Sequence, residues 1–296
     1  MWIPITLAAA TFQILRTARQ HELRSTLSST AAAFVRFAYG APLAVLASVV
    51  LFGVLGRDVP GIPFRFWLEV LVAGVAQILG TVALLQAFRV RDFAIGTVYS
   101  KTEVLFVAAL GALGLEPALS APGWVGALLV TAGVMWLASS GSIATLLRKA
   151  GDPAALLGLL AGMGFGAAAL GIRAASRSLE GAPSFDRAVV TLTFMLLLQT
   201  AINAAWFATT DPSQLARVAR AWRAAIPVGI FSLLGSTAWA WAFTLESAAK
   251  VRTLGQVELV IAFLIARFTL GERHTRADIT ASAVVLAGVV VVTVWG

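Results

Sequence analysis

The stretch AIGTVYSKTEVLFVAALGALGLE at residues 94–116 decides the fold class of this chain. It is apolar enough to cross a bilayer as a helix, which takes about 20 residues, yet Lys101 and Glu103 lie well inside it. A similar stretch, AKVRTLGQVELVIAFLIARFTLGE, returns at residues 249–272, and its Glu258 lies 155 residues after Glu103. A charge near the bilayer centre costs about 2.5–3.5 kcal/mol on insertion scales. Two such helices, half a chain apart, therefore predict a membrane protein with a repeated, charged core.

The composition supports this class. Of the 296 residues, 59% are hydrophobic and only 12% are charged, whereas soluble domains carry about 25% charged residues. The net charge is +8, but the arginines lie mostly in short gaps between apolar runs, as expected for loops facing anionic lipid headgroups. Nucleic-acid binding is therefore not expected. The absence of cysteine excludes disulfides and cysteine-ligated iron–sulfur clusters.

The apolar runs predict an all-α integral membrane protein with ten transmembrane helices. They are solidly apolar rather than alternating, which favours helices over the strands of a barrel. The first is expected to be a membrane helix rather than a signal peptide. The longest basic connection, residues 211–223, is either a short amphipathic helix in the membrane interface or a solvated loop. The ten runs are residues 2–20, 30–53, 64–87, 93–115, 121–140, 154–173, 186–208, 223–245, 249–270 and 278–295.

A repeat links the two halves of the chain. Five helices per half is an odd number, so the second copy should enter the membrane from the opposite side, which is the inverted-topology repeat of many secondary transporters. We expect repeats at residues 1–148 and 149–296, with a cavity between them. Besides the two glutamates, the matches at the 155-residue offset are Leu79-Gly80 with Leu234-Gly235, Ala94 with Ala249, and Gly133 with Gly288.

Several short motifs resemble one known family. Residues 34–37 contain an Arg-Phe pair, and Glu258 is followed by Leu-Gly-Glu-Arg at 270–273 and Ala-Gly-Val at 287–289. Glu103 begins a similar series in the first half. Over its whole length the chain resembles the EamA-like family of the drug/metabolite transporter superfamily. It departs from the family pattern in its first helix, which reads Phe-Gln-Ile-Leu-Arg at 12–16, and in lacking the usual proline after each helix glutamate.

The resemblance implies ten helices in two inverted repeats, in a multi-pass protein of the bacterial inner (plasma) membrane. It also implies export more often than import, with amino acids and related metabolites as frequent cargo. Both termini would then be cytoplasmic, whereas the arginines of the odd-numbered loops predict the reverse. The chain alone leaves that orientation and the oligomeric state open.

Charged residues near the expected bilayer centre are the first candidates for the substrate site: Arg16, Arg36, Lys101, Glu103 and Glu258. Lys101 and Glu103 are two residues apart, so a helix turns them roughly 200° away from each other. We therefore expect one of them to face the pathway and the other to pair with a neighbouring helix, with Arg36 as a partner for a glutamate. Structural ion pairing is the alternative role for these charges.

Polar and aromatic residues extend the predicted lining, because aromatic walls with a few polar groups suit small organic ligands. Gln256 is included since it occupies the position of Lys101 in the second repeat. Ordinary helix packing is the alternative for each residue of this set: Gln13, Tyr39, Gln77, Thr81, Tyr99, Asn203, Trp239 and Gln256. Gly158, Gly162 and Gly166 recur every four residues and predict close helix packing rather than a dinucleotide loop.

These features predict a secondary transporter that uses no cofactor, metal or ATP and is not an enzyme. Three cations against two carboxylates near mid-membrane favour a zwitterionic or anionic metabolite. Protons are a candidate coupling ion through Glu103 or Glu258, since burial can raise a carboxyl pKa. The alternatives are a proton-coupled drug exporter, which Gln13 and Arg16 on the first helix disfavour, and a non-transporting intramembrane enzyme or receptor.

Overall fold

The computed structural model describes residues 1–90, 93–138, 151–261 and 275–296. This part of the chain is 86% helix and contains no strands; one isolated bridge joins Gly61 and Glu180. The predicted all-α class is confirmed.

Each of the ten apolar runs contains a described helix. Six helical stretches in the described ranges are long and apolar enough to cross a membrane: residues 29–54, 64–89, 153–178, 184–210, 222–245 and 276–295. Three of the runs contain interrupted helices. The second run holds α2 (Ser29–Ala38), α3 (Gly40–Ser48) and the π-helical η2 (Val49–Val54), and the fourth holds α5 (Phe93–Ser100) and α6 (Glu103–Ala112). The ninth begins with α13 (Ala248–Gly255).

The described residues form two compact units. Unit 1 comprises Met1–Val75 and Gly171–Leu245, and unit 2 comprises Ala76–Leu170 and Glu246–Gly296. Two long helices, α4 (Phe64–Val90) and α9 (Pro153–Ser178), contribute to both units. Each unit therefore combines segments from both halves of the sequence, and the expected repeats at 1–148 and 149–296 remain a prediction.

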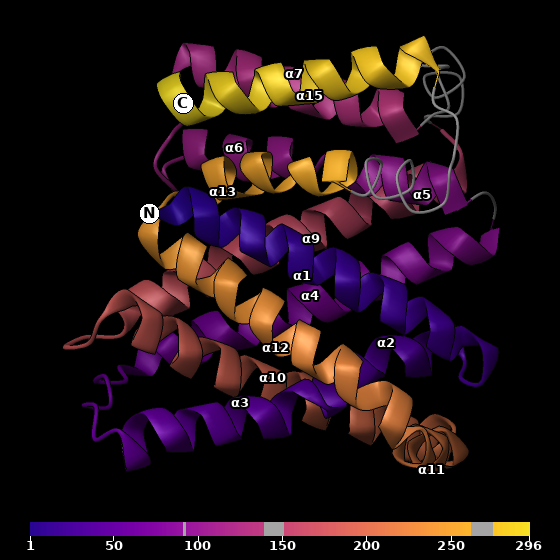
Figure 1. Ribbon diagram of the computed structural model, residues 1–296, viewed down its shortest axis with the longest axis vertical. Helices are drawn as coiled ribbons and strands as arrows, with labels where there is room; N and C mark the ends of the chain where they lie inside the picture. Colours follow the sequence, from indigo (N-terminus) through magenta and orange to yellow (C-terminus); the bar gives the residue numbers. More distant parts are fainter. Residues whose placement is uncertain (91–92, 139–150, 262–274) are drawn as a thin grey trace. The chain divides into compact units, whose positions relative to one another are not determined.

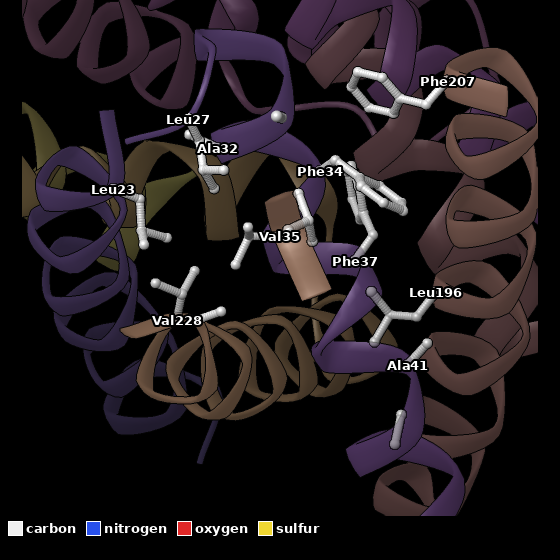
Figure 2. Close-up of a cluster of buried hydrophobic side chains, with 14 of the residues drawn as sticks. Leu23, Leu27, Ala32, Phe34, Val35, Phe37, Ala41, Leu196, Phe207 and Val228 are labelled. Atoms are coloured by element: carbon white, nitrogen blue, oxygen red, sulfur yellow. The ribbon is translucent and has the colours of Figure 1, made fainter. Parts of the chain in front are cut away.

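Unit 1 is built around the pairing of α1 (Trp2–Glu22) with α12 (Trp222–Leu245), which lie side by side in Figure 1. Helix α10 (Ser184–Thr210) packs on α12 and α3, and the short α11 (Pro212–Arg220) joins α10 to α12. An apolar cluster fills the space where η1 (Leu23–Ser25) and α2 meet α10 and α12. Figure 2 shows ten labelled members: Leu23, Leu27, Ala32, Phe34, Val35, Phe37, Ala41, Leu196, Phe207 and Val228.

Unit 2 contains a tight pair of helices, α7 (Ala121–Ala138) and α15 (Arg276–Trp295). Glycine allows the approach: a Cβ added at Gly288 would lie 2.7 Å from the carbonyl oxygen of Gly126. A capping box between Thr275 and Asp278 begins α15, satisfying the otherwise unpaired amides of its first turn. The same unit brings α13 against α6, and the candidate site lies at that contact.

A charged site at two helix breaks

The first break lies in the opening stretch of the sequence. Helix α5 ends at Ser100 and α6 begins at Glu103, and the turn between them uses i→i+3 hydrogen bonds from the amide of Lys101 to Val98 O (3.1 Å) and from that of Thr102 to Tyr99 O (3.2 Å). The hydroxyl of Thr102 also donates to the Tyr99 carbonyl, at 2.7 Å. Such side-chain bonds compete with the helical pattern and bend helices.

The second break lies at the equivalent place in the repeat. Helix α13 ends at Gly255, Gln256 forms a turn, and residues 257–261 are again helical. The amide of Gln256 donates to the carbonyl of Thr253 at 3.2 Å. Val98 and Lys101 correspond to Thr253 and Gln256 at the 155-residue offset. The same i→i+3 hydrogen bond therefore occurs in both halves of the chain.

The side chains at the two breaks pair reciprocally. Lys101, at the first break, donates to Glu258, two residues beyond the second break. Gln256, at the second break, donates from Nε2 to Oε1 of Glu103 at 3.2 Å, and Glu103 lies two residues beyond the first. Each turn residue thus contacts the glutamate of the other half: Lys101 forms an ion pair with Glu258, and the neutral amide of Gln256 donates to the carboxylate of Glu103.

Arg252 completes this cluster, although it was not among the candidate residues chosen from the sequence. Its Nη1 lies 3.7 Å from Oε1 of Glu103, and the two side chains are only 12% and 8% exposed. The residue spacing could have identified Arg252, because Arg252 and Gln256 are four residues apart and lie on one face of a helical segment. We call the five residues Lys101, Glu103, Arg252, Gln256 and Glu258 the charged cluster; its two cations balance its two carboxylates.

The expected separation of Lys101 from Glu103 is wrong. The estimate of roughly 200° holds for a continuous helix, and the turn at residues 101–102 changes the angular relation. Both side chains reach the segment around Gln256, one contacting Glu258 and the other Gln256 itself. The predicted pairing of Arg36 with a glutamate stays a prediction, since Arg36 lies in unit 1 and Glu103 in unit 2.

Glycines of α9 pack against the first break. A Cβ on Gly158 would lie 2.7 Å from the carbonyl oxygen of Gly96, and a Cβ on Gly162 would lie 2.8 Å from that of Ser100. Real Cβ atoms essentially never approach so closely. The four-residue glycine spacing therefore serves close helix packing, as predicted, and it supports the backbone that positions Lys101 and Glu103.

A buried carboxylate supports the second broken helix. Glu116 is 9% exposed, and its two carboxylate oxygens accept from the amide of Ala248, at 3.4 and 3.3 Å, in the first turn of α13. The hydroxyl of Ser247 caps the same helix by accepting from the amide of Lys250 at 3.4 Å. A negative charge at a helix N-terminus is favourable, so Glu116 and Ser247 together fix the start of the helix that carries Arg252.

The remaining predicted residues of unit 2 lie on α4 and α5. Thr81 donates its hydroxyl to the carbonyl of Gln77 at 2.8 Å, within α4. Tyr99 is buried beside Val98, Ala154 and Ala155 in a small apolar cluster. None of these contacts brings the three residues into the charged cluster.

Unit 1 contains the other predicted residues. Oε1 of Gln13 accepts from Nε1 of Trp239 at 3.1 Å, which joins α1 to α12. The hydroxyl of Tyr39 donates to the carbonyl of Val218 at 3.0 Å, a contact that holds α11. Asn203 donates to the carbonyl of Gln199 within α10, at 2.8 Å. Gln13 and Trp239 are brought together, whereas Tyr39 and Asn203 hydrogen-bond to backbone carbonyls.

The predicted arginines of unit 1 are partly buried. The guanidinium of Arg36 lies 4.8 Å from the ring centre of Phe37, and Arg16 lies on α1 beyond Gln13. Sequence analysis missed a third arginine in this unit: Arg173 is 8% exposed and donates to the carbonyl of Phe243 at 2.7 Å.

The charged side chains of the cluster in unit 2 can exchange their present partners for groups of a bound ligand. Each charged group of the cluster has an opposite charge in reach. Broken helices of this kind bind ions and substrates in transporters. Among the described residues, no group of three or more His, Cys, Asp or Glu side chains could hold a metal ion.

Comparison with known proteins gives a family match for the second half of the chain. No curated protein sequence gives a significant match to the chain. Among 28 matching chains of solved structures, one, described only as "Crystal structure of protein", has a TM-score of 0.72 at 16% sequence identity and covers 99% of this chain and 97% of its own length. That likeness shows a shared fold. The profile of the EamA-like transporter family matches residues 152–294. The resemblance predicted from the motifs is confirmed over residues 152–294, which match the EamA-like transporter family.

Proposed function

We propose that the protein is a secondary transporter, an exporter of a small zwitterionic metabolite such as an amino acid, working by alternating access between two inverted five-helix repeats. The repeats are residues 1–148 and 149–296, and the ten apolar runs are the ten spans. The membrane is the bacterial inner membrane. The protein is then a carrier rather than an enzyme, and it needs no cofactor.

The reciprocal pairing at the two breaks carries this proposal. Lys101 with Glu258 and Gln256 with Glu103 are contacts between equivalent positions, one made from each half of the chain. Buried charges in a membrane segment are costly, so a cluster repeated in this way indicates a use beyond packing. The cluster supplies Lys101, Glu103, Gln256, Glu258 and Arg252 to the substrate site.

The charge balance of the cluster supports a zwitterion. A ligand carrying one ammonium and one carboxylate can take the place of Lys101 and Glu258 in each other's contacts and leave no protein charge unpaired. A net cation or anion leaves one buried charge without a partner, and breaking a buried pair in that way costs about 3–5 kcal/mol. Of the two expected substrate classes, zwitterionic and anionic, the balanced charges of the cluster therefore favour the zwitterion.

The proposed lining also includes the residues predicted on the other helices: Gln13, Arg16, Arg36, Tyr39, Gln77, Thr81, Tyr99, Asn203 and Trp239. Of these, Gln13 and Trp239 have the strongest support, because they already contact each other through polar atoms. Protons are the proposed coupling ion, taken up by Glu103 or Glu258 when the ligand displaces their partners.

Uptake into proteoliposomes tests the function. We expect the purified protein to move one or more radiolabelled L-amino acids, and an imposed pH gradient to change the rate. Lys101→Ala and Glu103→Ala should each reduce the rate at least about tenfold, since each removes one member of a buried ion pair. Lys250→Gln is the matched control, because Lys250 lies on α13 but outside the charged cluster.

Three outcomes would contradict parts of the proposal. If Lys101→Ala and Glu103→Ala transport as the wild type does, the charged cluster is not the substrate site. If flux ignores the pH gradient, protons are not the coupling ion. If only lipophilic cations are moved, the protein is a drug exporter and the charge-balance argument fails.

A further inference from the structure

The basic connection between α10 and α12 is a well-defined helix. Pro212 occupies the first turn of α11, and the carboxylate of the preceding Asp211 accepts from Ser213 Oγ at 2.5 Å and from Gln214 Nε2 at 2.9 Å. These two hydrogen bonds, together with nearby Arg217, lower the pKa of Asp211 from its ordinary value. Proline at the start and a carboxylate at the N-terminus both favour a helix beginning here.

The apolar side of α11 is occupied by protein. Val218 is 4% exposed and belongs to the unit 1 core cluster, and Leu215 packs against that cluster. The hydroxyl of Tyr39 donates to the carbonyls of Val218 and Ala219, at 3.0 and 3.4 Å. Of the two sequence-based alternatives, the helix is therefore correct, but its apolar side faces α2 and the core rather than the bilayer.

The other side of α11 is basic and exposed. Arg217 and Arg220 are three residues apart, so they lie on one helical face, and both are exposed. Arg223 follows at the start of α12, with its guanidinium 5.2 Å from the ring centre of Trp222. Trp222 is itself 49% exposed. The only carboxylate among residues 211–223 is that of Asp211, whose Oδ2 lies 3.7 Å from Nη2 of Arg217. The three arginines therefore leave an excess of positive charge.

The position of this basic side is set by its neighbours. Helices α10 and α12 are both long and apolar enough to span a membrane, so α11, which turns across their ends in Figure 1, lies at a membrane surface. The opposite end of α10 lacks such an excess of charge at Arg57. There, Arg57 is paired with buried Asp186 at 2.7 Å, which neutralises its charge.

We propose that Arg217, Arg220, Arg223 and Trp222 form a binding surface for anionic phospholipid headgroups. Guanidinium groups match phosphate geometry and bind it through paired hydrogen bonds. Tryptophan favours the headgroup level of a bilayer. Because the apolar side of α11 is held by the protein, the arginines are presented to the headgroups without insertion of the helix.

Tryptophan quenching in vesicles tests the proposal on the full-length protein. The signal of Trp222 is the emission of the wild type minus that of Trp222→Phe. The quenchers are phosphatidylglycerol and phosphatidylcholine, each carrying a nitroxide near the headgroup end of one acyl chain. At 50 mM NaCl we expect phosphatidylglycerol to quench about threefold more strongly, since each basic residue near the surface adds attraction, and the ratio to fall toward 1 at high salt.

The arginines themselves are tested with the triple variant R217Q/R220Q/R223Q, which should lower the ratio to about 1 at low salt. Arg65→Gln is the control: Arg65 is an exposed arginine at the start of α4, in the same unit, and its loss should leave the ratio unchanged.

The outcomes separate lipid binding from its alternatives. A ratio of 1 in the wild type, or an unchanged ratio in the triple variant, overturns the proposal. An equal fall with Arg65→Gln means that the total charge, and not this surface, attracts the lipid. If inorganic phosphate abolishes the preference at constant ionic strength, the surface binds small anions rather than headgroups. Transport in phosphatidylcholine vesicles is a separate measurement, so this proposal can fail while the proposed function stands.

Discussion

Replacement of Lys101 by methionine should destabilise the protein through the carboxylate that it leaves behind. The side chains of Lys101 and Glu258 are 15% and 11% exposed, so neither is well hydrated. Removing one partner of a buried ion pair costs about 3–5 kcal/mol, mainly because the remaining charge has no partner. We expect Lys101→Met to lower the free energy of unfolding by an amount in that range.

The second change in this test removes the stranded charge. Glu258→Gln alone should also destabilise, because it leaves the ammonium of Lys101 without its ionic partner. The double variant Lys101→Met, Glu258→Gln contains neither charge, so it should be more stable than the sum of the single effects predicts. The structure implies a coupling energy of about 2–3 kcal/mol, near the upper end of values for contacting residues.

Denaturant titration in detergent micelles, followed by tryptophan emission, measures all four proteins of this cycle. The control cycle uses Arg19 and Glu22, whose side chains are 56% and 63% exposed although their charged atoms are 3.2 Å apart. Exposed pairs contribute only about 0.2–1 kcal/mol, so its coupling should be small. Equal coupling in the two cycles, or additive effects of Lys101→Met and Glu258→Gln, would refute burial of the charged pair.

Three further changes test the supports of the site. Gly162→Ala should destabilise by about 1–3 kcal/mol, as overpacking does, because its Cβ would lie 2.8 Å from a backbone oxygen of the first break; Gly151→Ala, where no described atom lies within 4 Å of the added Cβ, should have the wild-type melting temperature. Glu116→Ala should cost about 1–2 kcal/mol through the lost helix cap and slow transport, and normal flux would argue against a positioning role. Hydrogen bonds lower the pKa of Asp211, so its contribution to stability is complete above its unfolded value of about 3.9 and is lost as the pH falls through the lower folded value. Emission of Trp222 should therefore be constant from pH 8 to 5 and change below about pH 4, and Asp211→Ala should remove that acid-induced change.

The candidate site was only partly predictable from the sequence. Lys101, Glu103 and Glu258 stand out because charge inside an apolar run is expensive, and Gln256 follows from the repeat. Arg252 was missed, since it lies near the start of its run and looks like a loop residue. Its role depends on the distance of 3.7 Å to Glu103, which joins residues about half the chain apart.

The helix breaks were also beyond prediction. Neither contains proline, and the apolar pattern continues through both of them. The bends depend on weak local signals, such as the Thr102 hydroxyl bonding back to Tyr99, and on the glycines of α9 that admit the bent backbone. Hydrophobicity reports that a segment is buried, and it does not report whether the helix is continuous.

The sequence by itself determined the membrane class, the helical fold, the positions of the apolar runs, and the family resemblance later confirmed over residues 152–294. These follow from composition and from short motifs, which are local properties of the chain. Only the tertiary structure decided which charges pair, that Lys101 and Glu103 face the same neighbour, and that the apolar side of α11 is buried in protein. Pairing and burial depend on which distant segments come into contact, and local pattern does not contain that information.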